Sequence, residues 1–226
     1  MSIIDTFKEF KFTKKWFKNF FLMLISVTTM GFGVSLLKLT HFGTDPCSAM
    51  NYGVANKIGL SFGTYQLLLN LVLLIFVILF NWRLIGTGTI GNMVVVGYSA
   101  DFFTKIWLDV CHIPTELSLG VRIVILIPTL IIFVIAAACY MNSGCGMAPY
   151  DAIPFIICSG IEKRGKKDWF KPVRFCLDLT AMLIGWFTGG ETGLITVLMV
   201  ITLAPTVAYV GEFFNKHGIV STSGGE

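Results

Sequence analysis

Apolar residues along the chain gather into eight segments, separated by polar or glycine-rich stretches. The runs Phe20–Leu37, Ile123–Ala138 and Leu194–Val210 contain no Asp, Glu, Lys or Arg. About 20 apolar residues in helical geometry span the hydrocarbon core of a bilayer, and a soluble fold of this length cannot bury so many helices of that kind. The pattern therefore predicts an all-α fold, a polytopic transmembrane helical bundle.

The segments form two series of four, and the second member of each series is short. The first series covers residues 17–40, 46–57, 62–82 and 88–107, and the second covers 121–141, 149–161, 172–188 and 193–214. A helix of about 12–14 residues reaches only ~20 Å, against a hydrocarbon core of ~30 Å. Each half is expected to contain three long helices and one short helix.

Matches between the two halves predict an internal repeat. The pattern G-x-x-P-x-x-A occurs at Gly43–Ala49 and again at Gly146–Ala152, where each short segment begins. Farther on, Asn70 falls near the position of Asp178, and each half ends in an acid followed by two phenylalanines. The predicted units are a basic cytoplasmic N-terminus at 1–16, a first repeat at 17–110, a second repeat at 117–216 and a disordered tail at 217–226.

Composition and charge agree with a membrane protein. The chain has 226 residues, of which 55% are apolar and 13% charged, whereas soluble domains carry roughly 25% charged residues. The net charge of +4 comes from Lys and Arg beside the apolar segments, which is typical of cytoplasmic flanks of membrane helices. Nucleic-acid binding is therefore not expected.

The basic residues allow two arrangements of the short segments, and both place the two termini and residues 162–174 in the cytoplasm. If all eight segments cross, every basic residue is inside except Lys38 and Arg83, and this arrangement fits the positive-inside rule better. If the short segments are re-entrant, the halves become inverted. In that case Lys38, Lys57, Lys105 and Arg122 lie outside.

The chain lacks the common signatures of enzymes and metal sites. No G-x-x-x-x-G-K-[ST], H-E-x-x-H or G-x-S-x-G pattern occurs, so an enzyme is not expected. The six cysteines include no C-x-x-C pair and are interpreted as packing residues. We expect neither a cofactor nor a metal.

At the two G-x-x-P-x-x-A entries, the Gly86–Ile90 stretch and the acid-Phe-Phe helix ends, the chain resembles the YczE/YyaS/YitT-type family of bacterial integral membrane proteins, in its YczE-like branch. The second half departs from the pattern at Gly190–Gly193. The resemblance implies a multi-pass protein of the bacterial cytoplasmic membrane and brings no settled activity.

Paired short helices at matching positions of two repeats point to a transporter binding site. Their N-termini lie at Asp45 and Pro46 in the first half and at Pro149 and Asp151 in the second. Thr44 or Asp45 is suited to cap the first short helix. Unpaired N–H groups and positive dipole ends favour an anionic group of the substrate. The alternative is that Gly and Pro only shape tight extracellular loops.

Polar residues within apolar segments extend the candidate substrate-binding site. Asp178 is the sharpest case, because an ionisable group inside a membrane is costly. Its alternative role is an ion pair with Arg174, one turn earlier. The set is completed by Asn51 and Asn70, and the neighbouring side chains Tyr65, Gln66 and Asn92 either line the same cavity or form interhelical hydrogen bonds.

These residues predict a small secondary transporter or exporter of an unidentified small solute. The alternative is a membrane-embedded accessory or substrate-binding subunit of a larger transport or enzyme complex. The expected partners are the lipid bilayer and a small-molecule solute, with a protein partner or a homo-oligomer left open.

Overall fold

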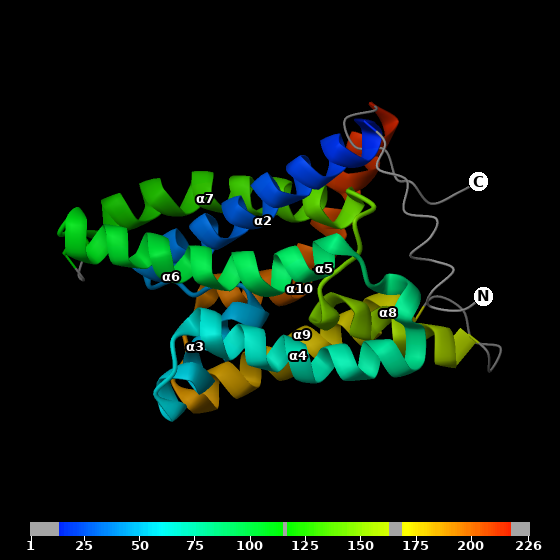
Figure 1. Cartoon of the computed structure of the whole chain (residues 1–226). Coiled ribbons are helices and arrows are strands. Elements are labelled where there is room, and N and C mark those ends of the chain that lie inside the picture. Colours follow the sequence, from blue (N-terminus) through cyan, green and yellow to red (C-terminus); the bar gives the residue numbers. More distant parts are fainter. Residues whose placement is uncertain (1–13, 115–116, 163–168, 218–226) are drawn as a thin grey trace.

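The computed structural model describes residues 14–114, 117–162 and 169–217, and these contain helices and no strand. The first half holds α2 (Lys14–Thr40), α3 (Pro46–Ile58), α4 (Phe62–Asn81), the single turn η1 (Trp82–Leu84), and a continuous helix composed of α5 (Thr87–Gly91), η2 (Asn92–Val96), α6 (Gly97–Lys105) and η3 (Ile106–Val110). The second half holds α7 (Leu119–Asn142), α8 (Pro149–Glu162), α9 (Phe170–Thr188) and α10 (Leu194–Lys216). The helices lie roughly along one axis of the molecule (Figure 1).

The prediction of an all-α bundle is confirmed. The basic N-terminus before Lys14, most of the basic 163–171 stretch and the tail after His217 lie outside the described residues.

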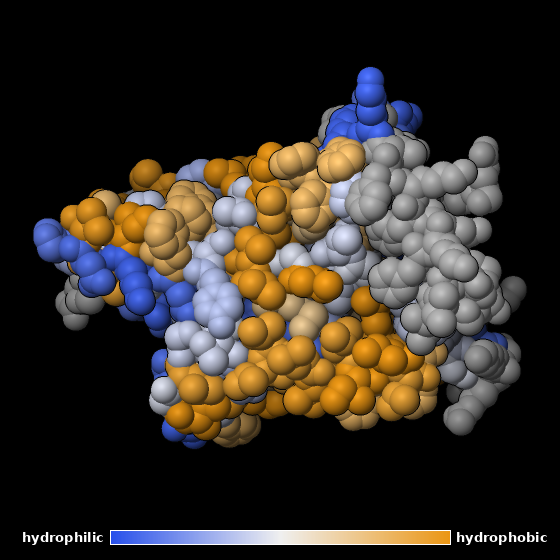
Figure 2. Space-filling view, viewed as in Figure 1, coloured by the Kyte–Doolittle hydropathy of each residue, from blue (hydrophilic) through white to orange (hydrophobic). Residues whose placement is uncertain are grey.

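In the described part of the chain, four helices are long and apolar enough to cross a membrane: Trp16–Thr40, Phe62–Leu84, Leu119–Asn142 and Leu194–Lys216. On α4, large apolar side chains such as Ile75, Leu79 and Phe80 are exposed, as expected of a surface in contact with lipid. Figure 2 shows an apolar band across the middle of this face and hydrophilic residues toward the ends of the long axis. The molecule is a membrane-embedded helical protein.

The two short helices each accompany one half of α9. At its start α3 packs Met50 against Ala181, and near its end Lys57 Nζ donates to the carbonyl of Phe187, at 3.2 Å. Helix α8 runs the other way: Asp151 contacts Arg174, and Phe155 lies 4.7 Å from Phe170 between ring centroids. The short helices therefore begin together near the middle of α9 and end at its opposite ends.

Each short helix ends at the same end of the molecule as the long helix before it. The residues after α2 contact the segment that follows α9, through Phe42 and Ile195, and α3 ends at that end too. At the other end, Asn142 of α7 accepts a hydrogen bond from Asn215, near the C-terminus of α10, and α8 ends on this side. This arrangement corresponds to the re-entrant alternative. It differs from eight crossing helices because α3 and α8 each extend only from the middle of α9 to one of its ends.

The loops that precede the short helices make closely similar contacts. Residues 41–45 pack against the segment before α10, and residues 143–148 pack against the segment before α5. The matching backbone bonds are Thr44 N to Glu191 O (3.0 Å) and Met147 N to Leu84 O (3.2 Å), and Ile195 N to Phe42 O (2.9 Å) and Gly88 N to Cys145 O (2.6 Å). Each loop thus joins its half of the chain to the other half.

Glycines allow α3 to approach α9 closely. A Cβ on Gly185 would lie 2.9 Å from the carbonyl carbon of Ala49, and one on Gly53 would lie 2.8 Å from the Gly190 nitrogen. Both neighbours are backbone atoms, which cannot rotate away as a side chain does. The small residues therefore fix the depth at which the half-helix sits.

Candidate functional site: a central cavity between two half-helices

A cavity of about 390 Å³ lies where the two short helices begin. Its wall includes Asp45 and Ser48 of α3, together with Tyr150 and Asp151 of α8. Lining residues are Met30, Val34, Asp45, Cys47, Ser48, Gln66, Asn70, Asn92, Val96, Phe133, Ala137, Tyr140, Met141, Asn142, Met147, Ala148, Tyr150, Asp151, Phe155, Phe170, Arg174, Leu203, Ala204, Val207, Ala208, Glu212 and Asn215. Cavities of about 300–1,000 Å³ are typical of small-molecule sites.

The cavity extends from the centre toward the end of α10. Glu212 and Asn215 line it there, and both are exposed. Phe155 and Phe170 also line this part of the cavity and contact each other. The cavity is therefore open toward the end of the molecule that carries the start of α2 and the end of α10; Figure 1 draws both of these helix ends on one side of the view.

The opposite end is closed by packing and by a polar network. Tyr52 stacks on Phe62, with ring centroids 4.2 Å apart, within an apolar cluster that also contains Val34, Phe133 and Met199. This cluster lies beyond the start of α3. It separates the cavity from the chain segments after α2 and α9.

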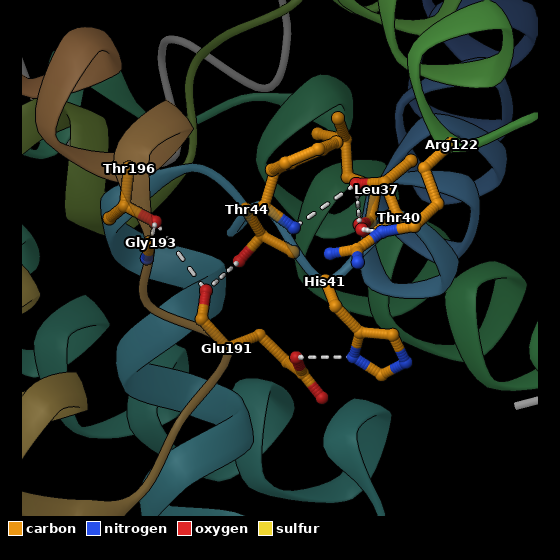
Figure 3. A network of polar contacts seen from close by, with 9 residues as sticks. Leu37, Thr40, His41, Thr44, Arg122, Glu191, Gly193 and Thr196 are labelled. Atoms are coloured by element: carbon orange, nitrogen blue, oxygen red, sulfur yellow. Dashed lines mark hydrogen bonds and ion pairs between the residues drawn. The ribbon is translucent and has the colours of Figure 1, made fainter. Parts of the chain in front are cut away.

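Figure 3 shows the polar network at the closed end. The Glu191 carbonyl accepts from the backbone N–H of Thr44 at 3.0 Å, and the Glu191 carboxylate lies 3.8 Å from His41 Nδ1. Arg122 donates from Nε to the carbonyl of Thr40. These contacts join α2, α7 and the α9–α10 loop on the side away from the opening.

Asp45 caps α3 and leaves half of its carboxylate unused. Its Oδ1 accepts from the backbone N–H of Ser48 at 3.1 Å, which confirms the predicted N-cap. Its Oδ2 is buried and has no hydrogen-bond partner among the described residues. The side chain belongs to the cavity wall, although the residue is only 7% exposed. A buried carboxylate oxygen without a donor costs free energy.

Arg174 joins two carboxylates beside the start of α8. Its Nε donates to Asp178 Oδ2 at 2.9 Å, and its Nη1 donates to Asp151 Oδ1 at 2.8 Å. Tyr150 Oη donates to the other oxygen of Asp178, at 2.9 Å. The guanidinium is thus held between two acids, with Tyr150 fixing the orientation of one of them.

Two amides complete the polar wall. Asn70 donates from Nδ2 to the carbonyl of Gln66 at 2.9 Å, while its Oδ1 is buried and has no partner in the described part of the chain. Asn92 also lines the cavity, at the start of the π-helical turn η2. Such turns occur often at functional sites, because they redirect a side chain within a helix.

The sequence pattern of a family of unknown function, DUF6198, matches residues 17–212. The chain belongs to this family. Among curated relatives, an uncharacterized protein of Haemophilus influenzae is 25% identical over 88% of this chain and 84% of its own. The uncharacterized membrane protein YczE of Bacillus subtilis is 27% identical over 76% of this chain and 75% of its own. No solved structure matches.

This DUF6198 protein is therefore a membrane protein of a YczE-like family, and its cavity contains part of the site predicted from the sequence. Asp45, Asn70 and Asp151 line the wall. The remaining predicted residues, Pro46, Asn51, Pro149 and Asp178, lie outside the lining set. Pro46 and Pro149 occupy the first helical positions of α3 and α8, where Pro is favoured.

Asp178 and Asn51 support the wall from behind. Asp178 is 1% exposed and bound by Arg174 and Tyr150, which confirms its alternative role, the ion pair with Arg174. Asn51 donates weakly to Cys47 Sγ at 3.8 Å. Of the neighbouring candidates, Gln66 and Asn92 line the cavity, whereas Tyr65 does not.

Several lining residues of this DUF6198 protein were missed from the sequence. Arg174 was considered only as a partner of Asp178, and its second carboxylate, Asp151, is distant in sequence. Glu212, the acid before the two phenylalanines that end the second half, also lines the cavity. No pattern in the sequence marks Tyr140 as a site residue. Its hydroxyl nevertheless accepts a hydrogen bond from the backbone N–H of Ala148, just before α8.

Proposed function

We propose that this protein is a secondary transporter of a small solute, built from two inverted repeats whose half-helices meet at the central cavity. The observation that carries the proposal is the meeting of the α3 and α8 N-termini at one cavity, whose wall includes acidic and amide side chains, in the middle of an apolar bundle. Broken or half-length helices at matching places in two repeats are the usual construction of such binding sites.

The contacts of the two loops support the inverted repeat. Residues 41–45 and 143–148 form equivalent hydrogen bonds with the segment before the last helix of the opposite half. Gly86 and Gly193 each donate from the backbone N–H to a threonine three residues later, at 3.0 and 3.1 Å. Inverted repeats can exchange conformations, so that the closed and the open end trade places.

The one-sided opening supports a transport cycle. The cavity opens at the end that holds the start of α2 and the end of α10, and we propose that this end is cytoplasmic, in a bacterial cytoplasmic membrane. The apolar cluster around Tyr52 and Phe62 and the network around Glu191 then form the outer barrier. In the alternate state this outer barrier opens and the cytoplasmic end of the cavity closes.

Reconstitution of the purified protein in liposomes tests this proposal. Radiolabelled organic cations, organic anions and sugars are offered under a pH gradient and under a sodium gradient, with protein-free liposomes as background. We expect gradient-driven uptake of one class, reduced at least tenfold by Asp45→Asn and unaffected by Asp109→Asn, which changes an exposed acid outside the cavity. No uptake of any class, together with co-purification of an ATPase, would instead favour the accessory-subunit alternative.

A further inference from the structure

The polar atoms left without partners at the cavity are acceptors. Asp45 Oδ2 and Asn70 Oδ1 are both buried, both belong to lining residues, and neither has a partner among the described residues. Asp45 and Asn70 are 7% and 3% exposed. Acceptors without donors cost free energy, so a ligand that supplies N–H groups removes this cost, whereas an anion does not.

The charged side chains of the cavity wall are mostly acidic. Among the described residues the lining includes three acids, Asp45, Asp151 and Glu212, and one base, Arg174. Arg174 is already bound to two carboxylates at 2.8 and 2.9 Å. The charge of Arg174 is therefore already neutralised by Asp151 and Asp178. The described part of the cavity wall then presents an excess of negative charge.

The helix N-termini do not reverse this sign. A helix dipole places roughly half a positive charge at the N-terminus, but α3 already holds the Asp45 carboxylate there and α8 carries Asp151 in its first turn. An incoming anion would meet these carboxylates at close range. The sequence-based expectation of an anionic group is thus opposed by the side chains that occupy both helix ends.

The remaining wall suits an organic cation. Five aromatic side chains of the described residues line the cavity: Phe133, Tyr140, Tyr150, Phe155 and Phe170. Ring faces attract ammonium and guanidinium groups. The volume of about 390 Å³ is much larger than a metal ion needs, and among the described residues no group of three His, Cys, Asp or Glu is placed to hold a metal.

We infer that the cavity binds a small organic cation with N–H donors, a primary ammonium or a guanidinium, between Asp45 and Asn70. This inference names the substrate class of the proposed transporter and so rests on the proposed function. The cation donates to Asp45 Oδ2 and Asn70 Oδ1, and its apolar part lies against the aromatic wall.

Ligand protection of the purified full chain in detergent tests the inference without any transport. The probes are butylammonium and butylguanidinium, with butyramide as a neutral match, butyrate as an anionic match and sodium ion alone. Binding to the folded state raises the unfolding temperature Tm in a saturable manner. We expect a rise with the two organic cations and none with the other probes.

Two variants assign the effect to the cavity. Asp45→Asn and Asn70→Leu should each weaken the cation-dependent rise at least tenfold in apparent affinity, each compared with its own ligand-free Tm. Asp109→Asn should leave the rise intact. Protection by butyrate, protection by sodium alone, no protection, or a cation effect that survives both variants would each overturn the inference. If the cations bind and no liposome flux occurs, the proposed transport function fails and the cation site stands.

Discussion

At the residue scale, Arg174 is the side chain on which the buried charges depend. Its side chain is 11% exposed, and its guanidinium contacts Asp151 and Asp178. Arg174→Gln leaves the buried carboxylate of Asp178 and the half-buried carboxylate of Asp151 without a counter-charge, which costs about 3–5 kcal/mol. Asp178→Asn costs less, because Arg174 keeps Asp151. We expect a large loss of Tm and of membrane abundance for the first variant and a small loss for the second.

The comparison has an internal control. Arg83→Gln removes a basic side chain that forms no ion pair among the described residues and should leave Tm unchanged. Adding Asp178→Asn to Arg174→Gln should recover part of the loss, because one stranded carboxylate becomes neutral. Equal stability of Arg174→Gln and the wild type would show that the acids do not need the guanidinium.

The sequence predicted roles for Arg174, Asp151 and Asp178 singly, but not the ion pairs that join all three. The spacing of Arg174 and Asp178 by one helical turn makes their ion pair readable, and Asp151 was predicted to lie in a first helical turn. The Arg174–Asp151 bond joins two helices. Since neither local spacing nor hydrophobic pattern specifies which helices are neighbours, this contact required the fold.

At the element scale, the short helices were predicted closely, because Pro46 and Pro149 mark their first turns and Asp45 caps one of them. Their depth in the bundle depends on glycine contacts that a linear pattern does not reveal. A Cβ on Gly185 would meet the backbone of Ala49 and Met50. The direction of α3 relative to α9 follows from such tertiary packing.

Gly185→Ala should destabilise the protein. Alanine gains about 1 kcal/mol in helix propensity, but its Cβ would lie 2.9 Å from the Ala49 carbonyl carbon, and overpacking costs typically about 1–3 kcal/mol. The matched variant Gly160→Ala, in α8, meets no atom within 4 Å and should be neutral or stabilising. Thermal unfolding in detergent measures both. Equal Tm values for the two variants would contradict the close approach of α3 and α9.

At the scale of the whole molecule, charge counting favoured eight crossings, and the structure has half-helices instead. The positive-inside pattern is a statistical bias over loops, and Lys38, Lys57 and Arg122 are used in local contacts. Lys38 lies over the Tyr52 ring, Lys57 binds a carbonyl, and Arg122 binds Thr40. The positions of these three basic residues therefore depend on packing contacts as well as on the orientation of the chain in the membrane.

Cysteine labelling distinguishes the two arrangements in cells. In a variant without native cysteines, Lys57→Cys should react with an impermeant maleimide from outside, and Arg83→Cys should react only after permeabilisation. Lys57 ends α3 and Arg83 follows α4, so these positions lie at opposite ends of the bundle. Eight crossings require the reverse pattern.

Access to Cys47 tests the central claim most directly, because alternating access requires that one position in the cavity face each side of the membrane in turn. Cys47 lines the cavity and is partly exposed. It is kept as the only cysteine and treated with an impermeant methanethiosulfonate reagent, in intact cells and in inside-out vesicles. The account predicts rapid modification from the cytoplasmic side and slower but complete modification from outside. Modification from one side only would contradict alternating access and the transporter proposal with it.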